Sequence, residues 1–345
     1  VPARVNIGGT KRAVLLVGGG YDTGQDTTLY SSDSIGRGIY MLDAETLDPK
    51  GTFPPPVEGK GVAYWSPVTV GGDLAFVGFA IAGDGNAALY AFDPETGQQE
   101  WSVPAENLIM AQPNYVDGVV YFGDTGGRVY AVDVESKRIK PGWPFEAESS
   151  IWASPLVEGG RVYVASMDHH LYSLDAESGE LIWEQKMGGA LAAPPRLADN
   201  LTLGDGILYI GAFDGRVHAV RAETGEIVED FDFMAKNWIW SLPLMVNDQL
   251  FVTSLDGRLY ALRAADGRAL WSFETAGPVS TSSPAVTEDA VYIGSTDGFL
   301  YSLDARTGEL RWKFDTGAPV ASSPAVYGER VYVGTRNHKI YALQQ

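Results

Sequence analysis

Short apolar segments alternate with polar turns along the whole chain, and one apolar–aromatic pair returns at nearly constant intervals. The eight pairs are Ile39-Tyr40, Leu89-Tyr90, Val129-Tyr130, Leu171-Tyr172, Val217-His218, Leu259-Tyr260, Leu300-Tyr301 and Ile340-Tyr341. Their second residues lie 50, 40, 42, 46, 42, 41 and 40 positions apart. A period of this length indicates one repeated supersecondary unit rather than several unrelated domains.

The clearest unit, Ser282–Phe314, predicts four short strands and shows no helical periodicity. Asp297-Gly298 is a strong hairpin signal, and Thr307-Gly308 provides a glycine that can adopt a positive φ. The predicted strands are Pro284–Val286, Val291–Gly294, Phe299–Leu303 and Leu310–Phe314. Four strands in about forty residues are typical of one blade of a β-propeller.

The repeat therefore predicts an all-β fold, an eight-bladed β-propeller of four-stranded antiparallel blades, with residues 1–345 as a single domain. Pro2–Ile7 is either the first strand of blade one or the missing outer strand of blade eight, which ends at Gln345 after its third strand. The other seven blades have recognisable fourth strands, ending at Phe53, Val103, Phe145, Trp183, Phe231, Phe273 and Phe314. The predicted blades cover approximately residues 2–53, 65–103, 111–145, 153–185, 192–231, 241–273, 282–314 and 322–345.

Composition narrows the classes of function. The chain has 44 acidic and 25 basic side chains, and its net charge of −19 argues against binding the phosphate backbone of nucleic acids. It has no cysteine, which excludes disulfides, thiolate metal sites and a cysteine nucleophile. No run approaches 18 apolar residues, so no membrane-spanning helix is predicted. The chain begins at Val1 rather than Met, which leaves an upstream export signal as an open alternative.

The corner before the fourth strand carries a recurring motif. Residues 91–101 follow the pattern A-x-D-x-x-T-G-x-x-x-W, with close copies at 173–183, 261–271 and 302–312. The pattern resembles the tryptophan-docking motif of the pyrroloquinoline-quinone (PQQ) β-propeller superfamily, and the resemblance covers essentially residues 12–345. It implies that four indoles dock flat between blades, where stacked aromatic rings add about 0.5–1.5 kcal/mol beyond area burial. These structural residues are Trp101, Trp183, Trp271 and Trp312.

Two branches of this superfamily imply different functions. The last blades, such as Ser322–Thr335, resemble the BamB-like branch of eight-bladed, non-catalytic outer-membrane lipoproteins that assist β-barrel assembly. The quinoprotein dehydrogenases bind PQQ and calcium, but many carry an adjacent cysteine pair that this chain lacks. The front of the chain departs from BamB, because Gly18–Gly24 and Gly38–Asp43 resemble the first blade of PilC/PilY-type pilus-associated propellers.

An insertion in the first blade is a weak candidate calcium site. Asp22, Asp26 and Asp33 alternate there with Gly, Thr and Ser, and carboxylate oxygens at close spacing can bind calcium. The loop does not match the EF-hand pattern, and we favour the alternative of a solvated polar loop. None of the four histidines has zinc-ligand spacing, and His218, which replaces the blade tyrosine, is expected to serve packing.

The strongest ligand-site signal is a set of bulky residues just before the first strands of several blades. In a propeller these positions lie at the mouth of the central channel, where an aromatic rim suits a planar ligand or a peptide. Lys236 and Asn237 are polar candidates for orienting such a ligand. The alternative, which we weigh more heavily, is that the large side chains simply plug the channel. The aromatic candidates are Tyr64, Trp65, Trp152, Trp238 and Trp240.

The sequence leads to two functional hypotheses. The favoured one is a non-catalytic, monomeric scaffold in the periplasm or at the outer membrane or cell surface of a bacterium, binding envelope or surface proteins and needing no cofactor. Its two versions are a BamB-like assembly role and a pilus- or surface-associated role, with membrane contact only through a lipid anchor or a partner. The alternative is a PQQ-binding quinoprotein dehydrogenase relative that holds PQQ and calcium, with the cofactor stacked in the aromatic mouth.

Overall fold

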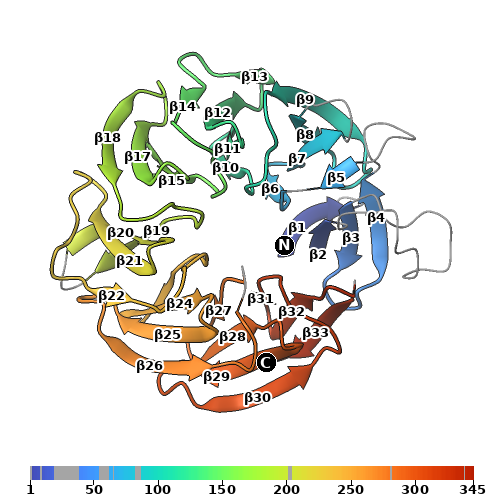
Figure 1. The fold of residues 1–345 in the computed structure, drawn as a ribbon. Coiled ribbons are helices and arrows are strands. Elements are labelled where there is room, and N and C mark those ends of the chain that lie inside the picture. The colour runs from blue at the N-terminus through green and yellow to red at the C-terminus, as the bar shows by residue number, and fades with distance from the viewer. Residues whose placement is uncertain are drawn as a thin grey trace. The chain divides into compact units, whose positions relative to one another are not determined.

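The computed structural model describes residues 2–7, 10–18, 39–53, 62–64, 66–81, 87–200, 204–279, 282–337 and 339–345. These residues form 33 strands and no helix (Figure 1). Accordingly, the described part of the chain has no helix that meets the length and hydropathy needed to span a bilayer. The chain divides into two compact units, one comprising Val1–Asp168 and Leu174–Glu180, the other His169–Ser173 and Leu181–Gln345.

The first three sheets are antiparallel and use strands in chain order (Figure 1). The first has the order β1 (Pro2–Ile7), β2 (Thr10–Gly18), β3 (Ile39–Asp43) and β4 (Pro49–Phe53). In the second, both β5 (Val62–Tyr64) and β6 (Thr69–Gly71) pair with β7 (Leu74–Ile81), followed by β8 (Ala87–Phe92) and β9 (Gln99–Ala105). In the third, β10 (Asn114–Val116) and β11 (Val119–Gly123) precede β12 (Arg128–Asp133), which pairs with two outer pieces, β13 (Arg138–Ile139) and β14 (Phe145–Glu146).

The remaining five sheets repeat this order. The fourth contains β15 (Leu156–Glu158), β16 (Arg161–Ala165), β17 (His170–Asp175) and β18 (Leu181–Lys186). The fifth contains β19 (Arg196–Asn200), β20 (Gly204–Gly211), β21 (Arg216–Arg221) and β22 (Phe233–Met234). The sixth contains β23 (Leu244–Val246), β24 (Gln249–Ser254), β25 (Arg258–Arg263) and β26 (Ala269–Glu274). The seventh contains β27 (Ala285–Val286), β28 (Ala290–Gly294), β29 (Phe299–Asp304) and β30 (Leu310–Asp315). The eighth contains β31 (Ala325–Tyr327), β32 (Arg330–Gly334) and β33 (Ile340–Gln344).

These sheets are the blades of an all-β, eight-bladed propeller, which confirms the predicted fold class. The pairing of β1 decides between the two alternatives left open by the sequence. Pro2 lies opposite Leu15 and Ile7 opposite Thr10, so β1 is the innermost strand of blade one. It is therefore engaged in its own blade and is not the outer strand of blade eight.

The hydrophobic core lies between neighbouring sheets. In the second unit, Ile207 and Tyr209 of β20 pack with Leu250 and Val252 of β24, and all four are buried. The inner strands are apolar on both faces, as in β28, where every residue is buried. Because both faces of these strands are buried, their sequences are nearly continuous apolar runs. The apolar area buried on both faces stabilises the folded chain.

The aspartate of the corner motif organises the turn before the fourth strand. Asp304 Oδ1 accepts the backbone N–H groups of Arg306 (3.0 Å) and Thr307 (2.9 Å), and Asp43 does the same for the second and third residues after it. This local bonding is the usual reason for aspartate at a turn. The Arg311 hydrogen bond, followed by the Thr307 N–H, lowers the pKa of Asp304 to about 2.

The tryptophan and glycine of the motif connect neighbouring blades. Trp271 Nε1 of blade six donates to the carbonyl oxygen of Ala305 in blade seven (3.1 Å), and Trp183 makes the same bond to Ala222. Gly308 has φ +74°, and a Cβ placed on it would lie 2.5 Å from the Trp271 ring. Within their own blades, Trp101 packs on Phe76 (5.8 Å between ring centroids) and Trp312 packs on Tyr292 (5.9 Å).

The fourth strand of blade five does not end where the sequence predicts. Its outer strand is β22 (Phe233–Met234), whereas the sequence placed the end of this strand at Phe231. Val228 and Phe231 are instead buried in a turn, in which the Phe231 N–H donates to the Val228 carbonyl (3.0 Å). Burying these two apolar side chains in the acidic segment displaces the extended pairing toward residue 233.

Candidate functional site

In blades three to eight, the linker that enters the blade is hydrogen-bonded to the hairpin between the second and third strands of that blade. The N–H of Phe213 donates to the Ala190 carbonyl (3.0 Å), and the N–H of Leu255 donates to the Trp238 carbonyl (3.0 Å). Thr296 and Pro278 form the same bond one blade later (3.1 Å). The repeat thus places each linker directly beside a hairpin tip.

The linker of blade six alternates between buried and outward residues. Ile239 is fully buried, and a Cβ placed on Gly211 would overlap its side chain, so glycine is needed where strand β20 ends. The neighbours on either side of Ile239 are Trp238, 47% exposed, and Trp240, half-buried. Because the Ile239 side chain points into the core, the indoles of Trp238 and Trp240 on either side of it point away from the core.

These two indoles form an aromatic cluster with Phe213, the residue at the hairpin tip of blade five. The rings of Phe213 and Trp238 are stacked, with centroids 4.4 Å apart and planes 5° from parallel. Trp240 is tilted at 59° to Phe213, with centroids 5.3 Å apart. Offset and tilted contacts at these distances are favourable for aromatic pairs. The cluster Phe213–Trp238–Trp240 is thus a rigid aromatic surface that is open on the Trp238 side.

Polar contacts fix the backbone beneath the cluster. The Trp238 N–H donates to Asn237 Oδ1 (2.8 Å), and Ser254 Oγ donates to the carbonyls of Asn237 (3.1 Å) and Trp238 (3.2 Å). The Lys236 N–H donates to Asp256 Oδ2 (3.0 Å), while its side chain is exposed and, among the described residues, makes no ion pair. Lys236 and Asn237, both predicted from the sequence, therefore border the cluster.

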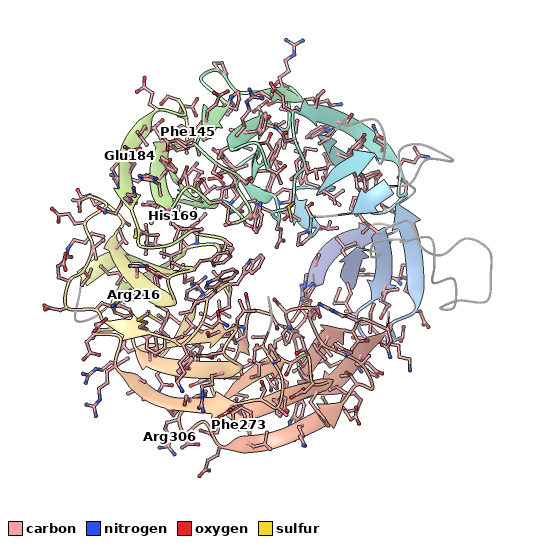
Figure 2. All side chains as sticks on the ribbon, viewed as in Figure 1. Phe145, His169, Glu184, Arg216, Phe273 and Arg306 are labelled. Carbon is pink, nitrogen blue, oxygen red and sulfur yellow. The ribbon has the colours of Figure 1, made fainter. Side chains whose placement is uncertain are left out.

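Asp256 also takes part in a second interaction that recurs among the blades, between a hairpin aspartate and the blade tyrosine. It also accepts the hydroxyl of Tyr260 (2.7 Å), as Asp297 accepts that of Tyr301 (2.7 Å). In blade five His218 replaces the tyrosine, and its Nε2 lies 3.0 Å from Oδ2 of Asp214. Burial raises the pKa of Asp214, but hydrogen bonds from His218 and the Arg216 N–H outweigh it and lower the pKa overall. Arg216, labelled in Figure 2, follows the hairpin that carries Phe213.

The remaining sequence-predicted residues lie in the other unit or outside the described side chains. Trp152 is half-buried and lies in the first unit, whereas Trp238 and Trp240 lie in the second. Tyr64 ends strand β5, and its side chain, like Trp65, lies outside the described residues. The candidate calcium ligands also lie outside them: Asp22, Asp26 and Asp33. Within the ranges that are described, no three His, Cys, Asp or Glu side chains come together as a metal site would require.

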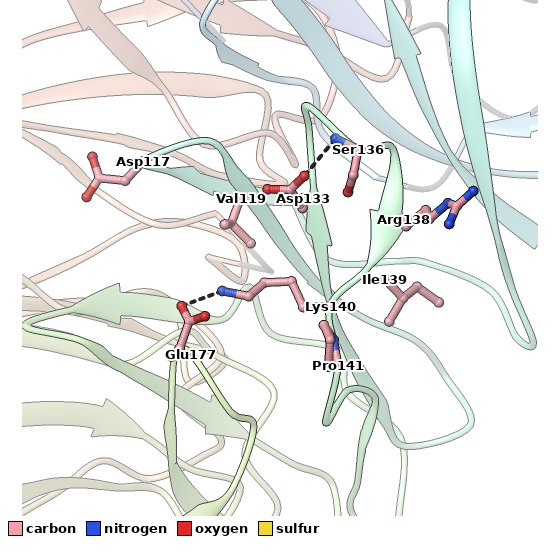
Figure 3. A pocket seen from close by; sticks show the side chains of 9 residues that line it. All are labelled: Asp117, Val119, Asp133, Ser136, Arg138, Ile139, Lys140, Pro141 and Glu177. Carbon is pink, nitrogen blue, oxygen red and sulfur yellow. Dashed lines mark hydrogen bonds and ion pairs between the residues drawn. The ribbon is translucent and has the colours of Figure 1, made fainter.

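The sequence did not predict Phe213, and it did not predict a surface pocket in the first unit. This pocket has a volume of about 570 Å³ and lies beside strands β12 and β13. Figure 3 shows its lining side chains, among which Lys140 Nζ pairs with Glu177 (2.7 Å). Its lining residues are Asp117, Val119, Asp133, Ser136, Arg138, Ile139, Lys140, Pro141 and Glu177.

A family model described as "Beta-alanine-activating enzyme, beta-propeller" matches residues 74–345. The chain belongs to this family of β-propellers. The match begins with strand β7, within blade two as the sequence divides the chain, and continues through blade eight. A comparison with curated proteins finds no match.

Solved structures share the fold of this family member at low sequence identity. BamB from Moraxella catarrhalis has a TM-score of 0.72 and 16% identity, covering 100% of this chain and 98% of BamB. Quinohemoprotein alcohol dehydrogenase from Comamonas testosteroni also has a TM-score of 0.72 and 16% identity, over 96% of this chain and 70% of the enzyme. The computationally designed Ika8 protein reaches 0.53 and 18%, over 84% and 98%. These matches confirm the predicted resemblance to PQQ-type and BamB-like propellers, which is a likeness of fold.

Proposed function

We propose that this protein is a non-catalytic, extracytoplasmic interaction scaffold and that the aromatic cluster contacts its partner protein. The observation that carries the proposal is the stacked pair of Phe213 and Trp238, in which Trp238 keeps 47% of its surface exposed. Exposed tryptophans in rigid, apolar settings are enriched at the centres of protein interfaces. A partner that covers this indole gains apolar burial without first ordering the side chain.

Two properties of the linker support this assignment. The backbone of Trp238 is held by hydrogen bonds at both its N–H and its carbonyl, so the surface is formed before a partner arrives. The exposed Lys236 borders the cluster in a protein of net charge −19, and it offers a partner carboxylate a positive group there. The partner is an envelope or surface protein, in either the BamB-like assembly version or the pilus-associated version of this role.

PQQ binding is the second candidate function, because a planar cofactor suits a flat indole and the fold is shared with a quinohemoprotein alcohol dehydrogenase. The described residues fit the accompanying calcium poorly, since they contain no group of three or more His, Cys, Asp or Glu side chains that would hold it. No reaction step is therefore assigned to them.

The test places a photo-crosslinking amino acid at Trp238 in the exported protein. A matched control carries it at Leu270 on the outer strand β26, which is 44% exposed. A discrete protein adduct from position 238 and none from position 270 supports the scaffold proposal. Equal adducts from both positions, or none from either, contradict it.

A parallel titration with PQQ and calcium distinguishes the second function. Quinone uptake by absorbance, together with dye-linked alcohol oxidation, would overturn the non-catalytic assignment. Trp238→Ala separates cofactor stacking on the cluster from binding elsewhere, because it removes the exposed ring and leaves the buried Ile239 in place.

A further inference from the structure

The linker that enters blade six carries a lysine at a position where the backbone does not require one. The N–H of Lys236 donates to Oδ2 of a hairpin aspartate (3.0 Å). The N–H groups of Glu148 in blade four and Ala276 in blade seven make the same bond at the same distance. One backbone conformation thus accommodates Lys, Glu and Ala, so the fold of a blade does not explain the lysine.

The residues two positions before and after this lysine are also specific to blade six. The linker carbonyl that accepts the hairpin N–H aligns the blades, and it belongs to Leu108, Ser150, Ala190, Trp238, Pro278 and Pro319 in blades three to eight. Counted four residues back, two back and at this residue, the blades read Pro-Glu-Leu, Glu-Glu-Ser, Lys-Gly-Ala, Met-Lys-Trp, Glu-Ala-Pro and Asp-Gly-Pro. Of these six blades, blade six alone places a cation between two large apolar side chains.

Both apolar side chains are open to solvent. Met234 is 61% exposed, more than any other large apolar side chain of the described residues, and Trp238 is 47% exposed. The other residues of the linker alternate with them, because Ala235 and Ile239 are buried. Successive outward side chains of an extended chain lie about 7 Å apart. Met234, Lys236 and Trp238, which we call the linker strip, therefore form an apolar, cationic and apolar series about 13 Å long.

Hydrogen bonds to a hairpin on each side hold the strip in place. On the blade five side, the N–H of Ala235 donates to the Gly215 carbonyl (2.8 Å). On the blade six side, the Trp238 carbonyl accepts the N–H of Leu255 (3.0 Å). The linker and both hairpins lie within residues 204–279, which are described without a gap. The strip is thus a preformed, extended surface, and methionine in such a surface adapts to the side chains that it meets.

The acidic groups beside the strip are already engaged. Asp256 accepts the Lys236 N–H and the Tyr260 hydroxyl (2.7 Å), and Asp232 pairs with Arg216 (2.6 Å). In the described part of the chain, the Lys236 ammonium has no acidic partner. In a chain of net charge −19, an unpaired cation between two apolar side chains favours a partner segment that supplies a carboxylate.

We propose that the linker strip binds an extended acidic segment of the partner protein, with an Asp or Glu on Lys236 and apolar residues on Met234 and Trp238. This inference rests on the proposed function and names the chemistry of the partner segment. An extended segment with the same period places these three residues two positions apart, as apolar-x-acidic-x-apolar. The pattern is the same in either chain direction. Burial of the two apolar residues gives affinity, and the carboxylate gives selectivity.

The experiment uses a fluorescein-labelled peptide with the sequence Ser-Leu-Ser-Glu-Ser-Leu-Ser and a second peptide with Lys in place of Glu. The variants Lys236→Ala and Lys236→Glu introduce the residues that blades seven and four carry at the equivalent position, so both are compatible with the backbone. The matched control is Lys313→Ala, which removes an exposed lysine from the outer strand β30.

Fluorescence anisotropy at low ionic strength is expected to show saturable binding of the Glu peptide to the wild type and to Lys313→Ala. Lys236→Ala should weaken this binding about two- to fivefold, and added salt should reduce the difference. Lys236→Glu should bind the Lys peptide more tightly than the Glu peptide. Trp238→Ala should weaken the Glu peptide about tenfold or more. In the wild type, the bound peptide should shift the NMR signals of the Met234 methyl and the Trp238 indole.

Three results would overturn the proposal. The first is no saturable binding of the Glu peptide to the wild type. The second is equal affinity of the wild type for the Glu and Lys peptides, or no reversal of preference in Lys236→Glu. The third is binding of phosphatidylglycerol vesicles that Trp238→Ala abolishes, which would assign the strip to a lipid surface. Crosslinking from position 238 tests the proposed function separately. A protein adduct without a preference for the Glu peptide refutes only the acidic chemistry, whereas the absence of an adduct refutes the proposed function.

Discussion

Replacing Gly308 by alanine tests whether the tryptophan corner holds neighbouring blades together. Gly308 has φ +74°, a backbone conformation that costs an ordinary L-residue about 1–2 kcal/mol. Its new Cβ would also lie 2.5 Å from the Trp271 ring, which would have to shift. That shift weakens the Trp271–Ala305 hydrogen bond, worth about 1 kcal/mol, and loosens the ring packing by about as much again. We therefore expect Gly308→Ala to lower the free energy of unfolding by about 3–4 kcal/mol.

Gly317 provides the matched control in the same unit. It has φ +71°, but a Cβ placed on it would meet nothing within 4 Å, so Gly317→Ala carries the backbone cost alone, about 1–2 kcal/mol. Urea unfolding followed by tryptophan fluorescence and by circular dichroism measures both variants and shows whether the transition remains cooperative. If the two variants lose the same stability, contact between Gly308 and Trp271 does not stabilise the corner and the reasoning fails.

Other substitutions test the linker, the hairpin and the corner. Trp238→Ala should cost less than about 1 kcal/mol because the ring is half-exposed, whereas Ile239→Ala should cost about 2–5 kcal/mol in the same urea assay. Tyr260→Phe should lower the free energy of unfolding by about 1 kcal/mol, because it loses the hydrogen bond to Asp256. A change near zero would mean that this hydrogen bond does not stabilise the hairpin. The pKa of Asp304, about 2, lies below the usual value near 3.9, so its stabilisation is present above about pH 4 and is lost as the pH falls toward 2. Thermal midpoints measured from pH 5 to pH 2.5 should therefore fall less in Asp304→Asn than in the wild type.

The blades could be predicted from the sequence because their determinants are local. Alternating apolar residues, a Gly-containing hairpin and an Asp-bonded corner all act within one unit of about forty residues. The strand limits of blade seven agree to within a residue or two, with Phe299–Leu303 predicted and Phe299–Asp304 observed. In blade five the burial of Val228 and Phe231 in a turn is a tertiary effect, and the strand pattern alone does not report it.

Features that depend on pairing between distant segments were harder to predict. The sequence of Pro2–Ile7 suits either edge of a blade, and only its register with β2 identifies it as an inner strand. Trp238 and Trp240 stood out because they are bulky residues just before the first strand of a blade. Phe213 lies 25 positions before Trp238 and looks like an ordinary hairpin residue, although comparing hairpin tips across blades would have shown that this one is aromatic.

The indole–carbonyl bonds between blades have a consequence for how the chain folds. Trp183 reaches a carbonyl 39 positions ahead, and Trp271 reaches one 34 positions ahead. Each blade therefore needs only its sequence neighbour to complete its docking, and contacts of such short range carry a modest loop-closure cost. Folding can begin at any well-formed pair of blades and extend in either direction along the chain, as in other repeat proteins. A defect at one corner should then interrupt this propagation locally, and the blades on either side of it should still form.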